Sequence, residues 1–361
     1  MVVVEMTSEN PSYRYSEGGI FSFIMDNNII FDKPFKTYEE LIAIMEERHI
    51  NVPDKEFATQ VLQNYSYYGI INGYKNTFLQ VPNSDSFIPG TNFNELYTLH
   101  IIDTGLNNII FKYILFLEKA LKSRISYLVA EKYGVYTNPS DLRCSEENDY
   151  LYKKNYSTSS GKRTNVLRSL KERISKDTKS PIMQHYLNDK NHVPPWILTT
   201  SIPYGLTIEW YNILISDDKQ NICDSFITPG LLSSEQSKEF VRKALELTKE
   251  YRNKIAHGNR TFSMISLPQL PKAQTLALTF NAISEEEYNN RMGQNDTFAV
   301  LLALIIMLSD KYLVSNLRSE LSNTLSPYAN VLFNNQNILD IFGFPSDLFQ
   351  RLDKLITRKF D

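Results

Sequence analysis

The chain has 361 residues and a formal net charge of −3 at pH 7, with 42% hydrophobic and 22% charged residues. These values are typical of globular proteins, so they exclude a disordered or low-complexity chain and a strongly basic nucleic-acid coat protein. The length favours one large domain or two of ordinary size.

Cysteine usage and hydrophobic runs indicate the compartment. The two cysteines, Cys144 and Cys223, are too few for a secreted disulfide framework, and no pair of Cys or His has zinc-ligand spacing. The valine-rich start lacks the basic region of a signal peptide. The most apolar run, residues 298–308, is shorter than the about 20 residues that span a bilayer. We therefore expect a reduced, cytoplasmic protein without a metal, a cofactor or a membrane contact.

The first predicted helices follow an irregular start. Thr37 and Glu40 have the spacing of a capping box, which predicts a helix to about residue 48, and a second helix is expected over residues 54–65. Residues 93–133 have helical apolar spacing almost throughout. Gly105 is expected to bend or break this long helix.

Further predicted helices occupy most of the remaining chain. Short helices are expected over residues 161–189, interrupted at Ser180-Pro181, and over residues 205–215. The clearest helix covers residues 234–257, where Ser233 and Gln236 fit a capping box and Gly258 follows the end. The remaining expectations are an irregular stretch with a possible strand pair over 259–291, one helix over 296–321 and a short one over 346–358.

These elements predict a mainly α fold in three parts. Residues 1–30 form an irregular N-terminal segment, and residues 31–90 a small helical module. Residues 91–361 form a larger helical domain with a basic insertion at about 150–180. Minor β or loop insertions are expected between the helices.

The helix over residues 234–257 carries the chemically distinctive residues. Successive residues advance by about 100°, so one stripe should face the core: Phe240, Ala244, Leu247, Tyr251 and Ile255. Arg252 and His257 lie elsewhere, with Asn253 and the small Ala256 between them, on the face away from the core.

An arginine, an asparagine and a histidine suffice for one kind of RNA cleavage. Histidine can act as acid or base on the 2′-hydroxyl or the 5′-oxygen, and arginine can stabilise charge on the phosphate. Attack by the 2′-hydroxyl needs no metal. The ordinary alternative is a histidine that stabilises a helix C-terminus beside solvated polar residues.

A resemblance to a known family favours the chemical interpretation. The run from Arg252 to His257 is similar to the R-N-x(3)-H motif of HEPN-superfamily ribonucleases. Four other segments resemble, in order, signatures of the Abi-like (AbiD/AbiF-type) abortive-infection branch: residues 33–42 (KPFKTYEELI), 67–74 (YYGIINGY), 118–122 (EKALK) and 193–196 (VPPW) followed by 204–206. The chain departs from the branch at one signature: Asp103 stands where the branch has an aspartate, but the arginine that follows it in the branch is absent from the sequence.

The resemblance implies a HEPN-like helical bundle and a metal-independent endoribonuclease that leaves a 2′,3′-cyclic phosphate. Arg252 would bind phosphate, His257 would act as acid or base, and Asn253 would orient the phosphate or the motif. Two such helices normally form a composite cleft, and this chain has one R-x(4)-H, so a homodimer is expected. Glu118 and Lys122 would support the site or form only an intrahelical salt bridge.

A basic segment is the expected RNA-binding surface. Its cations are Lys153, Lys154, Lys162, Arg163, Arg168, Lys171 and Arg173, with Lys176 and Lys179 beyond them. Tyr150, Tyr152 and Tyr156 lie beside these cations and have rings that could stack on bases. The alternative is a solvated basic helix.

Aromatic residues elsewhere are expected to pack. Tyr67, Tyr68 and Trp196 are assigned to the core or to packing anchors rather than to base stacking. The family also implies a regulator that restrains the ribonuclease, for which a small antitoxin RNA is one candidate. Two alternatives to the enzyme remain: a non-catalytic RNA-binding module, in which the motif only binds phosphate, and a helical interaction protein without RNA function.

Overall fold

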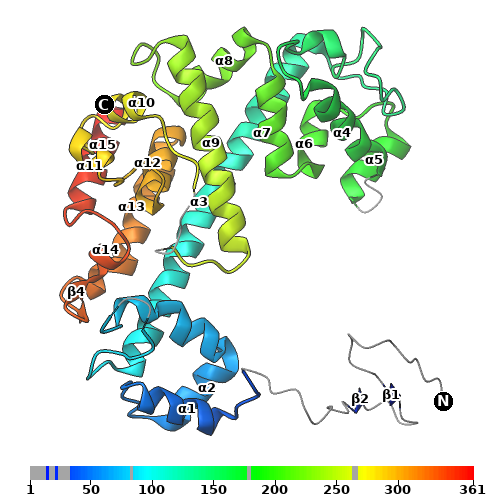
Figure 1. Ribbon diagram of the computed structural model, residues 1–361. Helices are drawn as coiled ribbons and strands as arrows, with labels where there is room; N and C mark the ends of the chain where they lie inside the picture. Colours follow the sequence, from blue (N-terminus) through cyan, green and yellow to red (C-terminus); the bar gives the residue numbers. More distant parts are fainter. Residues whose placement is uncertain (1–13, 16–20, 23–32, 82–83, 177–179, 262–266) are drawn as a thin grey trace.

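The computed structural model describes residues 14–15, 21–22, 33–81, 84–176, 180–261 and 267–361 (Figure 1). The fold is mainly α, as predicted. Strands are limited, in the described residues, to two short antiparallel pairs. Strand β1 (Arg14–Tyr15) pairs with β2 (Phe21–Ser22), and β3 (Leu332–Phe333) pairs with β4 (Gln336–Asn337). The remainder of the predicted irregular segment 1–30 lies outside the described residues.

The predicted N-terminal helices are present and lie at one end of the molecule (Figure 1). Helix α1 is Tyr38–Glu47 and α2 is Lys55–Tyr65, followed by a π turn, η1 (Tyr68–Asn72), and a 3₁₀ turn, η2 (Lys75–Thr77). The capping box of α1 is confirmed. The Glu40 carboxylate accepts from the Thr37 amide at 2.8 Å, and the Glu40 amide donates to the Thr37 hydroxyl at 3.3 Å. The assignment of Tyr67 to packing is confirmed, whereas that of Tyr68 was wrong because its side chain is 72% exposed.

Helix α3 (Phe93–Tyr133) is the central element, and it runs without a break. The predicted break at Gly105 was therefore wrong. Packing against α6, α7, α8, α9, α12 and α13 holds α3 together and overrides the weak helix propensity of one glycine. At about 1.5 Å per residue its 41 residues extend for roughly 60 Å.

The next helices form one lobe of the molecule. They are α4 (Arg163–Lys176), α5 (Pro181–Asp189), α6 (Pro195–Ser201) and α7 (Tyr204–Ile213), preceded by the turn η3 (Lys153–Asn155). The predicted break at Ser180-Pro181 is confirmed: Ser180 caps α5 and Pro181 begins it. Trp196, predicted as a packing anchor, is instead 47% exposed. It follows Pro195 in the first turn of α6, whose buried face is formed by Ile197 and Leu198.

Helices α8 (Ser216–Phe226) and α9 (Ser234–Ala256) pack on each other, and α9 also contacts α3, α7, α10 and α12. Between α9 and residue 291 the prediction of irregular chain with a strand pair was wrong for the described residues. They include the short helices α10 (Lys272–Leu278) and α11 (Glu285–Asn289).

The C-terminal helices complete the core. Helix α12 (Thr297–Met307) is buried along its whole length, as predicted for the apolar run. The single helix predicted over residues 296–321 was wrong, because the chain breaks after α12. There Asp310 caps a new helix, α13 (Lys311–Leu325), by accepting from the Tyr312 amide at 2.8 Å. The turn η5 (Ser326–Tyr328), α14 (Ile338–Ile341) and α15 (Leu348–Phe360) follow.

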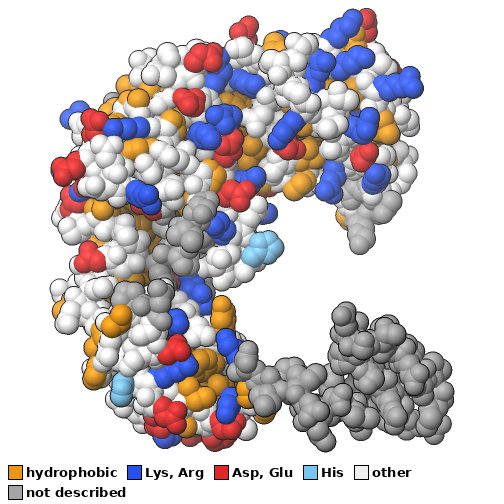
Figure 2. Space-filling model, in the orientation of Figure 1, with side chains coloured by type: hydrophobic (Ala, Val, Ile, Leu, Met, Phe, Trp, Pro, Cys, Tyr) orange, Lys and Arg blue, Asp and Glu red, His pale blue; other side chains and the backbone are white. Residues whose placement is uncertain are grey.

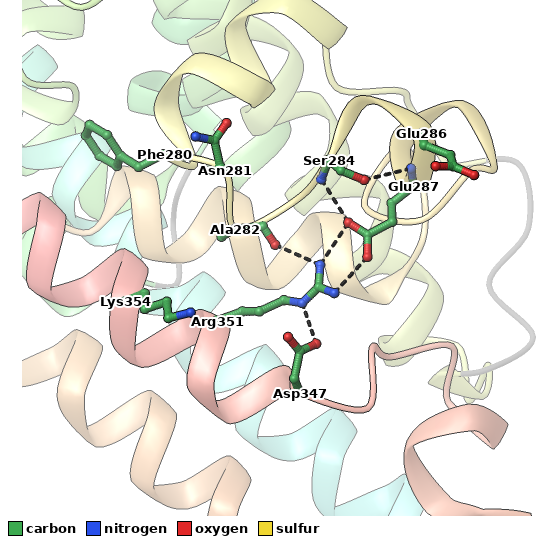
Figure 3. Close-up of a pocket in the computed structure, with 9 residues that line it drawn as sticks. All are labelled: Phe280, Asn281, Ala282, Ser284, Glu286, Glu287, Asp347, Arg351 and Lys354. Atoms are coloured by element: carbon green, nitrogen blue, oxygen red, sulfur yellow. Dashed lines mark hydrogen bonds and ion pairs between the residues drawn. The ribbon is translucent and has the colours of Figure 1, made fainter.

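One junction at the C-terminal side joins α11 to α15. The Arg351 guanidinium donates to both carboxylate oxygens of Glu287, at 2.7 and 2.9 Å, and to Asp347 and the Ala282 carbonyl (Figure 3). These bonds occupy the Arg351 guanidinium within the protein itself. A cavity of about 460 Å³ lies beside it. None of the described helices is both long enough and apolar enough to cross a membrane.

Candidate functional site

The candidate site lies at the C-terminal end of α9. The predicted capping box starts this helix: the Gln236 side chain accepts from the Ser233 amide at 3.0 Å, and the Gln236 amide donates to the Ser233 hydroxyl at 3.4 Å. The predicted core stripe is buried, except that Ile255 is only partly buried. The helix ends at His257, and Gly258 adopts a φ of 76°, which favours glycine.

Arg252 is less exposed than the helical wheel predicted. Its side chain is partly buried, and its guanidinium carbon lies 6.0 Å from the centre of the Phe111 ring on α3. Long helical side chains lean along the helix rather than straight outward, so Arg252 reaches the α3 interface. The Arg252 Nε atom is buried and has no hydrogen-bond partner in the described part of the chain.

Asn253 holds the guanidinium in place. The Arg252 Nη1 atom donates to the Asn253 side-chain oxygen at 3.3 Å. One face of the arginine fork is thereby fixed, while Nε keeps an unused donor. Asn253 thus contacts Arg252, and its role in orienting the motif or the phosphate stays a prediction.

His257 is exposed, as is its neighbour Ala256. Its main-chain amide donates to the Asn253 carbonyl at 3.1 Å, which fixes the backbone of the last turn. Within the described residues the imidazole ring has no hydrogen-bond or ion-pair partner, so both ring nitrogens are accessible to a ligand. Arg252, Asn253 and His257 therefore occupy the last two turns of one helix, at its boundary with solvent.

The chain after His257 is anchored to α3 by a buried network that sequence reasoning missed. The Asp103 carboxylate accepts from the Thr261 amide at 2.8 Å and from the Tyr74 hydroxyl at 3.0 Å. The Thr261 hydroxyl donates to the Asn107 side chain at 2.5 Å. Burial raises the pKa of Asp103, and the hydrogen bonds from Thr261 and Tyr74 oppose that rise. The aspartate retained in the family signature was the available signal for this role.

The same network connects the motif to the N-terminal helices. Arg260 donates to the Gly69 carbonyl at 3.0 Å and lies over the Tyr74 ring, and Asn259 donates to the Lys254 carbonyl at 2.9 Å. A pocket of about 260 Å³ adjoins these groups and Gly258. The position of the α9 terminus is thus set by contacts with two other parts of the chain, α3 and residues 69–74.

Glu118 and Lys122 lie on α3 and form the intrahelical salt bridge that was one of their two predicted roles, with 2.8 Å between Nζ and Oε1. Glu118 is only 8% exposed, and its second carboxylate oxygen is buried without a hydrogen-bond partner in the described residues. Both Glu118 and Arg252 influence the buried Tyr204 hydroxyl. Burial mainly raises the pKa of Tyr204; Glu118 raises it further, and Arg252 lowers it. The support of the site by Glu118 remains a prediction.

The basic segment divides into an exposed part and a buried part. Lys171, predicted to bind RNA, is completely buried and donates to Asp149 at 2.6 Å and to the Asn138 carbonyl at 2.9 Å. It has to be removed from the predicted surface because its charge is used inside the fold. Tyr150, Tyr152 and Tyr156 are also buried, so their predicted base stacking was wrong.

The other cations of the segment remain at the surface. Six are exposed: Lys153, Lys154, Lys162, Arg168, Arg173 and Lys176. Arg163 is partly buried and donates to the Lys153 and Tyr156 carbonyls. Lys179 lies outside the described residues. Figure 2 shows Lys and Arg side chains gathered over the part of the molecule that carries α4 and α5.

The fold and site define a helical protein with a partly solvent-accessible Arg, Asn and His at the end of one helix. A comparison with family models matches residues 60–263 to the Abi-like protein family, which is more than half of the chain. The chain therefore belongs to the Abi-like family, which associates it with abortive infection, a form of phage defence. No curated protein and no solved structure matches the chain.

Proposed function

We propose that the chain is a cytoplasmic HEPN-type endoribonuclease that cleaves RNA without a metal ion, as the toxin of a phage-defence or toxin–antitoxin system. The observation that carries the proposal is the end of α9. In the described residues the partly exposed Arg252 side chain is hydrogen-bonded only to Asn253, and the exposed His257 ring has no partner. Groups that a fold leaves unpaired at a partly exposed site are candidates for contact with a ligand.

The proposed reaction assigns one task to each residue. His257 moves a proton at the attacking 2′-oxygen or the departing 5′-oxygen, and Arg252 stabilises charge that develops on the phosphate. Asn253 holds Arg252 in the orientation that the 3.3 Å contact defines. The products are a 2′,3′-cyclic phosphate and a free 5′-hydroxyl. Glu118 and Lys122 would support Arg252 from α3.

A second copy of the chain would complete the cleft. One chain contains one R-x(4)-H sequence, so a homodimer provides two motifs related by a twofold axis. Cleavage by such a protein would have to be restrained in the cell, and a small RNA bound at the basic surface would be one suitable antitoxin.

The test uses a labelled single-stranded RNA and the purified full-length protein in the presence of a chelator. The parent protein should cleave the RNA, and His257→Ala and Arg252→Ala should each lower the rate by at least about a hundredfold. His185→Ala is the matched control because His185 is an exposed histidine on α5, and its cleavage rate should not change.

Retained cleavage in His257→Ala would contradict the proposal. An alternative outcome is salt-dependent RNA binding by the parent without cleavage products, and this would identify a non-catalytic RNA-binding module instead.

A further inference from the structure

A second polar cavity lies at the other end of α9. It has a volume of about 550 Å³ and is bordered by the end of α7, the start of α8, the first turns of α9 and the loop after η3. Its lining includes Ser157 and Ser159 from that loop and Ser216 at the start of α8. It therefore joins the end of the basic segment to the helix that carries the candidate motif.

Three cations from two helices line this cavity: Lys219 on α8, and Lys238 and Arg242 on α9. Lys238 donates to the Ser216 hydroxyl at 2.8 Å and pairs with Glu235, while Arg242 pairs with Glu246 at 2.9 Å. Lys219 differs from both, because its ammonium has no hydrogen-bond or ion-pair partner among the residues that the structure describes.

The charges around Lys219 are unfavourable for an empty cavity. The pKa of Lys219 is lowered, first by burial and then by the neighbouring positive charge of Lys238. Cys223 and Glu235 oppose this shift, and Arg242 adds a smaller effect in the same direction as Lys238. Of the two lining carboxylates, Glu235 is engaged with Lys238, and Glu239 accepts from the Gln274 side chain at 2.6 Å. Like charges that face one partly buried space are stabilised when an anion joins them.

The cavity beside Arg351 provides a contrast. There the guanidinium is surrounded by the carboxylates of Glu287 and Asp347 and by a carbonyl, and Lys354, which also lines the cavity, is exposed to solvent (Figure 3). The cavity at Lys219 differs, because its partly buried ammonium has no ion-pair partner among the described residues.

The cations of α9 also connect this cavity to the motif. Four cations of α9 are spaced by four, seven and three residues: Lys238, Arg242, Lys249 and Arg252. At about 100° per residue they lie on one face of the helix, within a sector of about 80°. Arg242 and Arg252 are therefore separated by about 15 Å along the helix axis. A few nucleotides of single-stranded RNA can span that length.

We propose that the cavity formed by Lys219, Lys238 and Arg242 binds a phosphate group of the RNA that is not cleaved, and so anchors the strand along α9 toward Arg252. The choice of RNA as the source of the phosphate rests on the proposed function. The chemistry that the cavity recognises, a phosphate dianion or diester, rests on its own cations.

The experiment measures RNA binding rather than cleavage. In a His257→Ala background, a labelled single-stranded RNA is titrated at several salt concentrations, followed by fluorescence anisotropy. Lys219→Gln should weaken binding about five- to tenfold and lower the salt slope by about one. Lys243→Gln is the matched control, since Lys243 is an α9 cation outside the cavity, paired with Glu246. It should change affinity less than about twofold.

A second arm separates the cavity from RNA and guards against a folding defect. Inorganic phosphate should raise the melting temperature of the parent more than that of Lys219→Gln, and Lys219→Arg, which keeps the charge, should restore RNA binding. Equal RNA affinities and salt slopes for the parent, Lys219→Gln and Lys243→Gln would overturn the proposal. Stabilisation by phosphate with unchanged RNA affinity would also overturn the assignment to RNA. Absence of cleavage by the parent would reject only the proposed function, because the binding comparison does not depend on cleavage.

Discussion

The basic segment and the end of α9 both suggest RNA binding from their sequences, but the fold treats their charges in opposite ways. In the basic segment Lys171 is enclosed with Asp149, and the tyrosines beside it are buried. At the end of α9 the Arg252 Nε atom has no partner in the described residues, and His257 is exposed.

This difference separates charges that build a fold from charges that remain available for a ligand. A buried lysine with a carboxylate and a carbonyl around it has its hydrogen bonds satisfied and contributes to a specific packing arrangement. A guanidinium held by one amide oxygen retains donors for another molecule. A count of basic residues gives both the same weight.

The largest effect is expected when the buried ion pair of Lys171 and Asp149 is removed. Lys171→Met should destabilise the protein by about 3–5 kcal/mol, because it leaves the buried Asp149 carboxylate without its cation. Urea unfolding followed by circular dichroism measures the change. Lys176→Met is the control on the same helix, since the exposed pair of Lys176 with Glu172 should contribute less than about 1 kcal/mol. A stable Lys171→Met protein with weakened RNA binding would return Lys171 to the binding surface.

The next largest effect is expected at Arg252, at the end of α9. Arg252→Lys keeps the positive charge but loses the planar fork and the contact with Asn253, so RNA cleavage should fall by about ten- to a hundredfold. The measurement is the single-turnover cleavage rate, with melting temperature as a check on folding. Cleavage equal to that of the parent would show that only a charge is needed at this position.

Smaller effects are expected for the exposed cations of α4. Arg168→Gln and Arg173→Gln should each weaken RNA binding about two- to threefold and lower the salt slope by roughly one phosphate contact. Lys311→Gln, an exposed cation on α13 that pairs with Asp361, should leave the affinity unchanged. Equal affinities of the three variants would show that α4 adds only to the overall positive charge and makes no specific contact with RNA.

The smallest expected effect concerns the saturated junction of α11 and α15. The hydrogen bonds from Arg351 hold the pKa of Glu287 at about 2, below its usual value of 4.5. Because the folded pKa is the lower one, the ionised carboxylate stabilises the fold above about pH 4.5, and this contribution is lost as the pH falls toward 2. The difference in urea midpoint between the parent and Glu287→Gln should therefore shrink from pH 7 to pH 3. A difference that stays constant with pH would show that the ion pair contributes no pH-dependent stability.

Local sequence signals predicted the fold where one segment decides the structure. Thr37 and Ser233 identified helix starts, Gly258 identified a helix end, and spacing identified the buried stripe of α9. Distant contacts decided the rest. Packing along α3 overrode Gly105, Asp310 ended an apolar run that has no internal break signal, and Asp149 withdrew Lys171 from the surface.

The site shows the same division. The motif residues were predictable because they lie on one helix, where spacing determines direction. The Asp103 network and the cavity at Lys219 were not, because each depends on how separate elements pack together.

The unbroken α3 helix gives the molecule a mechanical connection between its two ends. Asp103 and Glu118 project from one rod whose internal hydrogen bonds run without interruption. A partner that displaces α1 and α2 would therefore act through a stiff lever, since rotation at one end of such a rod is transmitted to the other. The α9 terminus, attached to the rod through Thr261, would move with it.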